Sequence, residues 1–360
     1  MGGSEQVIHQ IATGAGRHGV RTDVLSLTPD RGAPTTEMPG YTVYRAPLDF
    51  QVASTFFSWS AFSRFSRLVK DYDLVHYHFP WPFMDLVHFA TRHGKPSIVS
   101  YHSDIVKQKR LLQLYRPLMH RFFNSVDRIV SEAPPYAESS EVLRRFRHKV
   151  NIIPIGLDKA TYPQPDPERL AHWRERLGER FFLFIGVLRY YKGLHYLVEA
   201  MKGANYPVAI VGAGPEESAL KEQAGKLGAN QVHFLGKLSN EDKAALLTLC
   251  HGLVFPSHLR SEAFGISLLE GAMYGKPMIS CEIGTGTTYI NQADVTGLVI
   301  PPGDPVALRQ SMDRLWQEPE LAARMGVAAE QRYWELFTAE RMVQSYVDLY
   351  REVACAPRSA

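Results

Sequence analysis

Short apolar runs alternate along the chain with longer segments in which apolar residues recur at helical spacing. Such runs, rich in Val, Ile, Leu and Phe, are typical of buried strands. They predict strands over 22–27, 74–78, 97–101, 128–131, 150–153, 181–185, 207–211, 232–235, 252–255, 277–280 and 296–299. The helical spacing predicts helices that include 5–18, 106–124, 194–201, 215–227, 240–249, 307–317 and 338–354. Strands that alternate with helices form parallel sheets from βαβ units, so we expect an α/β protein.

Two such sets of elements follow one another, which predicts two doubly wound, Rossmann-like domains. The length of 360 residues supports this division, because a single hydrophobic core stops growing at about 250–300 residues. Residues 153–158, followed by a proline-rich stretch over 163–167, have the composition of a hinge. We expect a first domain over 1–155, a second over 156–337, and a last segment, 338–360, whose helix returns to the first domain.

The start of the chain departs from this plan. Gly2 and Gly3 lead directly into a predicted helix, whereas in a doubly wound domain a strand precedes the first glycine loop and its helix. We therefore expect that the first strand of the N-terminal domain is missing, either because leading residues were lost or because this domain begins unusually.

Charge is distributed unevenly. Lys and Arg outnumber Asp and Glu by 19 to 13 in residues 1–155, whereas residues 156–360 carry 21 against 24. A basic first half favours an anionic partner, such as a membrane surface or a phosphorylated acceptor, over nucleic acid.

Composition excludes several classes of protein. The chain is 45% hydrophobic and 21% charged, as in soluble globular proteins. Its cysteines form no C-x-x-C pair, which argues against a disulfide framework or a zinc site and fits a reducing cytosol. Spanning segments of about 18 uncharged apolar residues and a signal-peptide pattern are absent from the sequence. We expect a protein that is neither exported nor integral to a membrane.

Two glutamates eight residues apart, Glu262 and Glu270, lie in the most informative segment, 255–270. If that segment is helical throughout, eight residues rise about 12 Å, which exceeds the roughly 5–5.5 Å between the carboxylates of a double-displacement glycosidase. The two side chains would then serve different parts of a long ligand. Ser261, Gly265 and the amides that follow would open a helix whose N-terminus stabilises a phosphate. A surface cap and a salt-bridged helix residue are the structural alternative.

A second segment, 186–193, combines basic residues with glycines at a predicted strand-to-helix junction. Arg189 and Lys192 are three residues apart and can face one anion, while Gly193 permits a tight turn. The alternative is that both basic side chains are simply solvated.

These segments resemble the E-x7-E motif and the diphosphate-binding loop of the retaining GT-B glycosyltransferases of family 4, also called glycosyl transferases group 1. The resemblance covers nearly the whole chain and is strongest to bacterial O-polysaccharide mannosyl- and rhamnosyltransferases. It implies two Rossmann-like domains that face a cleft, with the acceptor held by the first and the donor by the second.

The resemblance also implies roles for individual residues. His102, in the strand-end run 101–104, resembles the family histidine that lies against the donor sugar, although a lone histidine there is otherwise structural. The residues with a catalytic role would be Glu262, His102, Arg189 and Lys192. Those that bind the donor would be Gly2, Gly3, Arg189, Lys192, Gly212, Gly236, Lys237, Leu238, Glu262, Phe264, Gly265, Ile266 and Glu270.

Residues 282–291 depart from the Gly-Gly-x-x-Glu loop of many family members and resemble transferases that use GDP-mannose or GDP-rhamnose. We therefore expect a retaining, metal-independent transfer of mannose or D-rhamnose from a GDP-sugar to a lipid-linked glycan in lipopolysaccharide O-antigen biosynthesis. The protein would work in the cytoplasm, peripherally at an anionic membrane surface, without a cofactor or nucleic acid. The alternatives are a UDP-sugar-dependent transferase of the same family, a GT-B nucleotide-sugar epimerase, and a non-catalytic GT-B protein that docks on membranes.

Three patterns suggest other chemistry and are rejected. Residues 14–19 satisfy G-x-G-x-x-G but end a helix and lead into a strand, the reverse of the dinucleotide fingerprint. Gly212-Ala213-Gly214 follows a strand, but Glu217 takes the place of the third glycine. Asp71-Tyr72-Asp73 mimics the metal-binding Asp-x-Asp of the other glycosyltransferase fold, but it introduces the predicted strand 74–78.

Residues 106–123 place six basic or titratable side chains among eight large apolar ones. Such a helix can lie on an anionic bilayer, and the aromatic stretch 56–65 adds a second apolar surface. The alternative is a pair of ordinary domain helices with solvated basic faces.

Overall fold

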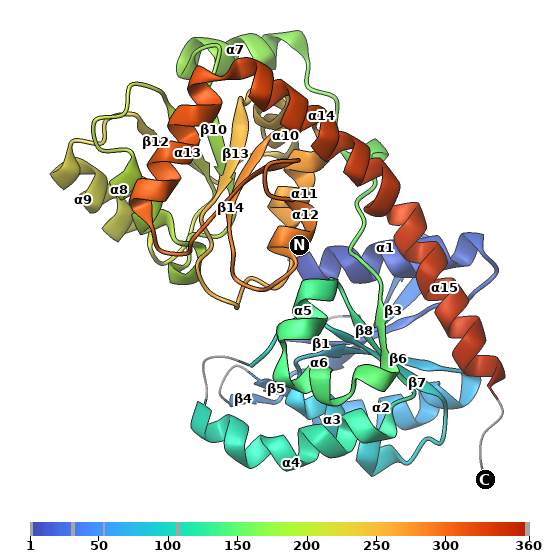
Figure 1. The fold of residues 1–360 in the computed structure, drawn as a ribbon. Coiled ribbons are helices and arrows are strands. Elements are labelled where there is room, and N and C mark those ends of the chain that lie inside the picture. The colour runs from blue at the N-terminus through green and yellow to red at the C-terminus, as the bar shows by residue number, and fades with distance from the viewer. Residues whose placement is uncertain (1–2, 30–32, 53–54, 106–108, 357–360) are drawn as a thin grey trace. The chain divides into compact units, whose positions relative to one another are not determined.

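A computed structural model describes residues 3–29, 33–52, 55–105 and 109–356 (Figure 1). The chain divides into two compact units. Unit 1 comprises Met1–Gly156 together with Ala339–Ala360, and unit 2 comprises Leu157–Thr338. The chain therefore leaves unit 1 after Gly156 and re-enters it at Ala339.

The main sheet of unit 1 is parallel, with the order β6-β7-β8-β9. Its strands are β6 (Val75–Phe79), β7 (Ser97–Tyr101), β8 (Arg128–Ser131) and β9 (Val150–Ile152). The intervening helical elements are α3 (Pro82–Thr91), α4 (Lys109–Ser125), α5 (Pro134–Ser139), α6 (Glu141–Arg145) and η2 (Arg147–Lys149). Val99, Ile129 and Phe122 are fully buried, so the alternating βα pattern is expressed as a parallel sheet with an apolar core.

The rest of unit 1 contains elements that the hydrophobic pattern does not predict. Strand β1 (Val24–Thr28) pairs in parallel with β3 (Tyr41–Pro47), which pairs antiparallel with β2 (Thr35–Met38) in a separate three-stranded sheet. A hairpin of β4 (Phe50–Val52) and β5 (Thr55–Phe57) leads into α2 (Trp59–Leu68) and η1 (Val69–Asp71). Within the described residues no strand precedes the first helix, α1 (Gly3–Arg17).

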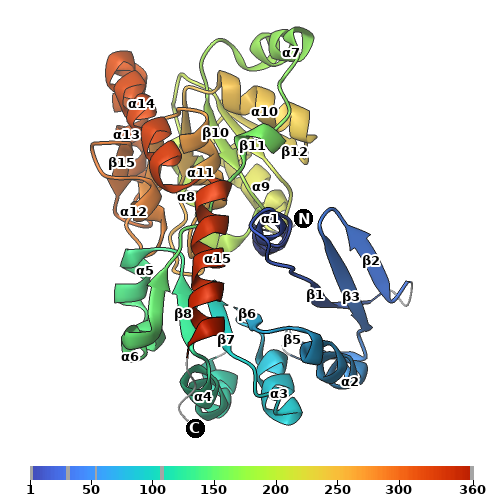
Figure 2. The same ribbon diagram turned by 90° about the vertical axis from the view of Figure 1, so that its right-hand side faces the viewer.

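The last helix, α15 (Ala339–Cys355), contacts α1 and crosses it, as both ribbon views show (Figures 1 and 2). Ala15 contributes to a buried cluster with Val343 and Val347 of α15. A Cβ atom at Gly14 would lie 2.6 Å from Cγ2 of Val343. The two helices can therefore approach this closely only because residue 14 has no side chain.

Unit 2 contains one six-stranded parallel sheet with the order β12-β11-β10-β13-β14-β15. The strands are β10 (Phe182–Ile185), β11 (Val208–Val211), β12 (Val232–Gly236), β13 (Gly252–Phe255), β14 (Met278–Cys281) and β15 (Gly297–Ile300). This is the doubly wound order, in which the direction of winding reverses between β10 and β13. Ligands of such sheets bind outside the carboxyl ends of the strands at this switch point.

Helices cover both faces of the unit 2 sheet. They are η3 (Lys159–Thr161), α7 (Pro167–Leu177), η4 (Tyr190–Lys192), α8 (Leu194–Ala200), α9 (Glu217–Leu227), α10 (Asn240–Leu249), α11 (Ile266–Met273), α12 (Thr287–Ile290), α13 (Pro305–Gln317) and α14 (Pro319–Leu336). Phe182, Ile210 and Leu197 are fully buried between the sheet and these helices. In the described part of the chain, no helix is both long enough and apolar enough to cross a membrane.

Candidate active site

Glycines bring three loops together at the carboxyl edge of the unit 2 sheet. Gly193, which follows β10, has φ +70°, and a Cβ atom there would lie 2.0 Å from the carbonyl oxygen of Pro256. Gly212, which follows β11, has φ +133°, and its Cβ would lie 1.9 Å from the carbonyl oxygen of Gly186. Only glycine fits such backbone contacts, so the loops after β10, β11 and β13 meet at the switch point of the sheet.

This arrangement pairs two of the predicted catalytic side chains. Lys192 Nζ donates a hydrogen bond to Glu262 Oε2, which also accepts one from Ser257 Oγ at 3.0 Å. Lys192 and Glu262 are 8% and 9% exposed, and the ammonium lies 4.7 Å from the centre of the Phe255 ring. The ion pair is nearly buried, and it places both charges at the switch point of the unit 2 sheet. Arg189, by contrast, is exposed.

Glu270 has a different set of partners. It lies in α11, whereas Glu262 lies in the turn before that helix, because α11 begins only at Ile266. The rise calculated for a continuous helix between the two glutamates therefore does not apply. Glu270 Oε1 accepts hydrogen bonds from Tyr162 Oη and from Lys243 Nζ, both at 2.8 Å.

The other predicted donor-side residues lie on the same loops of unit 2. Gly236 ends β12 with φ +69°, and it is followed by an exposed Lys237 and a half-buried Leu238. The N-cap of α11 is Gly265, with φ +101°, between a buried Phe264 and a half-buried Ile266. The roles assigned to these residues by resemblance stay predictions.

His102 lies in unit 1, directly after β7, where both of its ring nitrogens have partners. Nδ1 lies 2.6 Å from Oε1 of Glu132, and Nε2 lies 2.9 Å from Nδ1 of His78. Because a carboxylate can only accept, we assign the Nδ1 proton of His102 to the bond with Glu132. Burial, together with the neighbouring histidines His76 and His102, holds the pKa of His78 well below its usual range. These contacts within unit 1 therefore fix the orientation of the His102 ring and its tautomer.

The glycine pair at the start of the chain is only partly described. Gly3 is the first residue of α1, and Gly2 lies outside the described residues. The role predicted for the pair stays a prediction.

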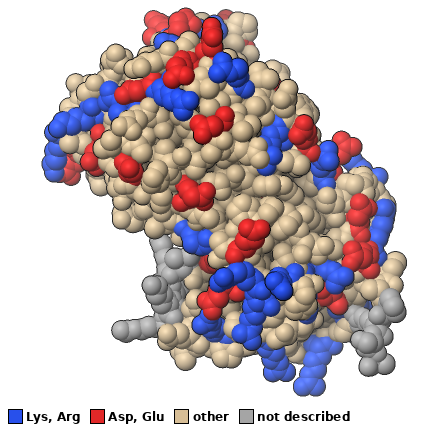
Figure 3. Space-filling view, in the orientation of Figure 1, with Lys and Arg blue, Asp and Glu red and all other residues tan. Residues whose placement is uncertain are grey.

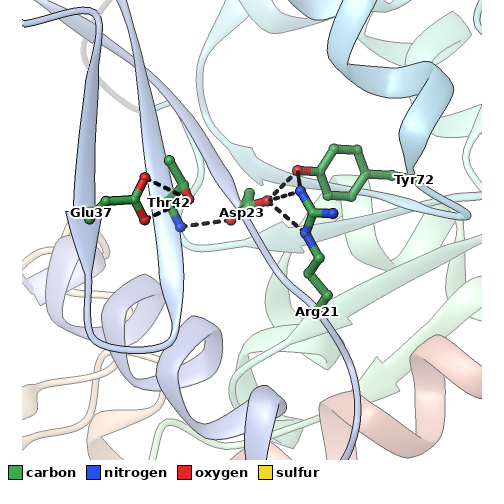
Figure 4. Close-up of polar contacts among 5 residues, drawn as sticks. All are labelled: Arg21, Asp23, Glu37, Thr42 and Tyr72. Carbon is green, nitrogen blue, oxygen red and sulfur yellow. Dashed lines mark hydrogen bonds and ion pairs between the residues drawn. The ribbon is translucent and has the colours of Figure 1, made fainter.

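The central residue of the segment Asp71-Tyr72-Asp73, Tyr72, makes structural contacts (Figure 4). The Tyr72 hydroxyl donates a hydrogen bond to Asp23, whose other oxygen accepts the backbone N–H of Thr42 at 2.6 Å. Burial alone would raise the pKa of Asp23, but hydrogen bonds from Tyr72, Thr42 and Arg21 outweigh it and lower the pKa. Asp71 and Asp73 are exposed, and among the described residues no three His, Cys, Asp or Glu side chains are grouped to hold a metal ion.

The doubly wound sheet with glycine-shaped loops and an E-x7-E segment defines a glycosyltransferase of the GT-B fold. Residues 1–161 match the family described as Glycosyltransferase Family 4, and residues 167–332 match Glycosyl transferases group 1. The chain belongs to this family, which confirms the sequence-based expectation. Solved structures agree on the fold, since sucrose-phosphate synthase from Thermosynechococcus elongatus superposes with a TM-score of 0.81 at 20% identity, over 99% of this chain and 94% of the other.

Two relatives are much more similar. D-rhamnosyltransferase WbpZ of Pseudomonas aeruginosa is 59% identical over 339 residues, which are 94% of this chain and 89% of the relative. O-antigen chain mannosyltransferase C of Escherichia coli is 49% identical over 350 residues, which are 97% of this chain and 94% of the relative.

Several side chains at these sites were not predicted from the sequence. Ser257, Tyr162 and Lys243 contact the two glutamates of unit 2, and Glu132 and His78 contact His102. Tyr162 lies just before the proline-rich stretch 163–167, and Lys243 lies in a predicted helix. Neither sequence context indicates a partner. Of these side chains, only His78 has a local sequence signal, because it alternates with His76 in the predicted strand 74–78.

Proposed function

We propose that this protein is a retaining glycosyltransferase that transfers D-rhamnose or mannose from a GDP-sugar to a growing lipopolysaccharide O-antigen glycan. The observation that carries the proposal is the 59% and 49% identity, over nearly the whole chain, to a D-rhamnosyltransferase and an O-antigen mannosyltransferase. The ion pair of Lys192 and Glu262 at the switch point of unit 2 supports a charged ligand at this position.

The residues at the edge of the unit 2 sheet suit a sugar diphosphate. Arg189, Lys192 and the amides at the start of α11 would neutralise the diphosphate, while Glu262 would bind hydroxyls of the sugar. As the family resemblance implies, Glu270 would bind the hydroxyls of the nucleotide ribose. As the bond between the anomeric carbon and the diphosphate oxygen breaks, the acceptor oxygen would bond to the anomeric carbon on the same face, and the leaving diphosphate oxygen would take the acceptor's hydroxyl proton. Fixed positive groups around that oxygen favour the transition state. This route retains the anomeric configuration and requires neither a protein nucleophile nor a divalent cation.

The choice of donor rests on residues 282–291 as well as on the relatives, so UDP-sugars are the main competitor. Purified protein would be incubated with GDP-mannose, GDP-D-rhamnose and a panel of UDP-sugars together with a lipid-linked O-antigen primer. Product from a GDP-sugar with retained configuration, determined by NMR, is the expected result. Turnover with UDP-sugars alone would overturn the donor assignment, and no product with any donor would favour the non-catalytic alternative.

We also propose that the acceptor is lipid-linked and that unit 1 contacts an anionic membrane at the cytoplasmic face. Large apolar side chains are exposed on unit 1, among them Leu114 of α4 at 81% and Trp59 of α2 at 71%. Lys and Arg side chains gather over the α4–α6 region (Figure 3), where Arg116, Arg121 and Arg144 are exposed. Exposed apolar and basic groups together favour shallow binding to anionic lipid.

The role expected for residues 106–123 needs a correction. Met119, Phe122 and Phe123 are buried, and Tyr115 donates a hydrogen bond to the buried Asp85 of α3. The apolar face of α4 therefore packs mainly on the core of unit 1, and two leucines near its start, Leu111 and Leu114, are exposed. Lys107 lies outside the described residues, as do the side chains of Lys109 and Arg110.

A vesicle experiment tests the membrane contact. Wild-type protein should sediment with phosphatidylglycerol vesicles at low salt and be released at high salt, whereas Leu114→Ser with Trp59→Ser should bind weakly. Val327→Ser in unit 2, where Val327 is 58% exposed on α14, is the matched control. Equal binding by all three proteins would show that the exposed residues of unit 1 are not the contact.

A further inference from the structure

Three segments of unit 2 meet at the carboxylate of Glu270. Tyr162 follows η3, Lys243 lies in α10 and Glu270 lies in α11. The hydroxyl and the ammonium each donate a hydrogen bond at 2.8 Å, and both end on Oε1. The side chain of Glu270 is 6% exposed and that of Lys243 is 24% exposed. The cluster is thus nearly closed to solvent on the side of Glu270.

The two oxygens of the Glu270 carboxylate differ in their contacts. Each carboxylate oxygen has about two lone pairs, so two donors fill the capacity of Oε1. Oε2 takes part in neither bond and keeps its lone pairs for a ligand. Lys243 Nζ also lies 5.2 Å from the centre of the Tyr162 ring, which fixes the ammonium over the aromatic face.

Packing alone is a weak explanation for this cluster. Burying an ion pair costs about as much as the pair returns, and apolar residues of similar volume often stabilise a protein as well or better. The loops of the predicted donor site, by contrast, flank both helices of the cluster: Gly236–Leu238 precedes α10 and Glu262–Gly265 precedes α11. A charged group held here is therefore well placed to bind part of the donor.

We propose that Lys243 and Tyr162 are positioning residues that hold Glu270 by Oε1, so that Oε2 accepts hydrogen bonds from the two hydroxyls of the nucleotide ribose. The inference rests on the proposed function, in which Glu270 binds the ribose of the donor. It assigns ribose recognition to a three-residue unit rather than to one glutamate. Loss of either positioning residue should leave Glu270 free to turn away and should reduce the preference for ribose over deoxyribose.

The test compares ligands that differ by one hydroxyl. Calorimetry would give the Kd of GDP, 2′-deoxy-GDP and 3′-deoxy-GDP, with UDP and its deoxy forms in parallel, for wild type, Lys243→Met, Tyr162→Phe and Glu270→Gln. For wild type, each deoxy ligand should bind about tenfold more weakly, the scale of one hydrogen bond to a charged group. In both positioning variants this ratio should fall to about threefold or less. Lys221→Met, which removes an exposed lysine paired with Glu217 on α9, should leave the ratio unchanged.

A purely structural role would lower thermal stability without changing the ratio between ribose and deoxyribose ligands. If Lys243→Met and Tyr162→Phe keep the wild-type ratio while Glu270→Gln removes it, the positioning role is overturned and the donor site stands. If Glu270→Gln also keeps the ratio, or if wild type does not discriminate, the ribose assignment in the proposed function fails as well. Tyr162→Phe removes a single hydroxyl, so it keeps the test decisive should Lys243→Met fail to fold.

Discussion

Replacing Lys192 by methionine should separate the structural from the chemical contribution of the buried ion pair in unit 2. The change keeps most of the side-chain volume but leaves the carboxylate of Glu262, 9% exposed, without its cation. Removing one partner of a buried pair typically costs about 3–5 kcal/mol, because an uncompensated charge stays behind. The hydrogen bond from Ser257 Oγ to Glu262 persists, so we expect the lower end of that range, about 3 kcal/mol.

The assay is a double-mutant cycle in which the free energy of unfolding and the rate of sugar transfer are both measured for each variant. Glu262→Gln leaves a buried ammonium and should also destabilise unit 2, whereas the double variant removes both charges and should recover most of the lost stability. Transfer should instead fall by about 10²–10³ in both single variants and stay low in the double variant, because each group stabilises the donor in the transition state.

An exposed pair provides the control. Lys221 and Glu217 form an i,i+4 ion pair on α9 with side chains 52% and 30% exposed, and Lys221→Met should cost at most about 0.5 kcal/mol. The reasoning is refuted if Lys192→Met is no more destabilising than Lys221→Met, or if either change at the buried pair leaves transfer within about twofold of wild type.

Three further predictions follow from other parts of the structure. Gly212→Ala places a methyl group 1.9 Å from the Gly186 carbonyl oxygen and should destabilise unit 2 by about 3 kcal/mol or more. Gly228→Ala, in the left-handed region at φ +63° and ψ +31° with open space around it, should cost only about 1–2 kcal/mol. Equal costs in urea unfolding would contradict the role of the close approach. Burial lowers the pKa of His76 to about 3. Between pH 6.5 and about 3 the unfolded chain therefore binds a proton that the folded state does not, and stability should be lost as the pH falls through this window. His76→Asn should show a smaller loss of melting temperature between pH 7 and pH 4.5, and an unchanged pH dependence would contradict this role of His76. EDTA should leave sugar transfer unaffected. If EDTA abolishes transfer and Mn²⁺ restores it, Asp71 and Asp73 must be reconsidered as metal ligands.

The sequence predicts the central strands well, because their signal comes from complete burial. Strands β7, β8 and β13 begin and end at the predicted residues, and each is a short apolar run between polar or turn-forming residues. The strands β2, β4 and β5 escape prediction because they are short and partly exposed. Strand β3 is longer but mostly half-buried, so it too supplies little hydrophobic signal. The division of the unit 1 strands into separate sheets follows from pairing, which periodicity does not encode.

The candidate site shows the same limit at the level of single residues. Motif spacing identifies Lys192, Glu262 and Glu270, since loops between strands and helices carry local signals such as glycine and charge. Their partners are remote in the sequence: Tyr162 and Glu270 are 108 residues apart and bond through side chains alone. Nothing in the local composition near Tyr162 or Lys243 indicates such a contact, which depends on how three loops and helices pack.

The path of the chain through unit 1 has a consequence for the order in which the protein is made. Unit 2 is continuous in sequence, whereas unit 1 needs α15 to cover α1, with Gly14 packed against Val343. Because domains generally fold as they leave the ribosome, N-terminal part first, residues 1–156 emerge early but must wait for Ala339–Cys355 to be synthesised. In that interval Ala15 of α1 lacks its cluster partners Val343 and Val347 of α15, and apolar surface that stays uncovered during folding is prone to aggregation.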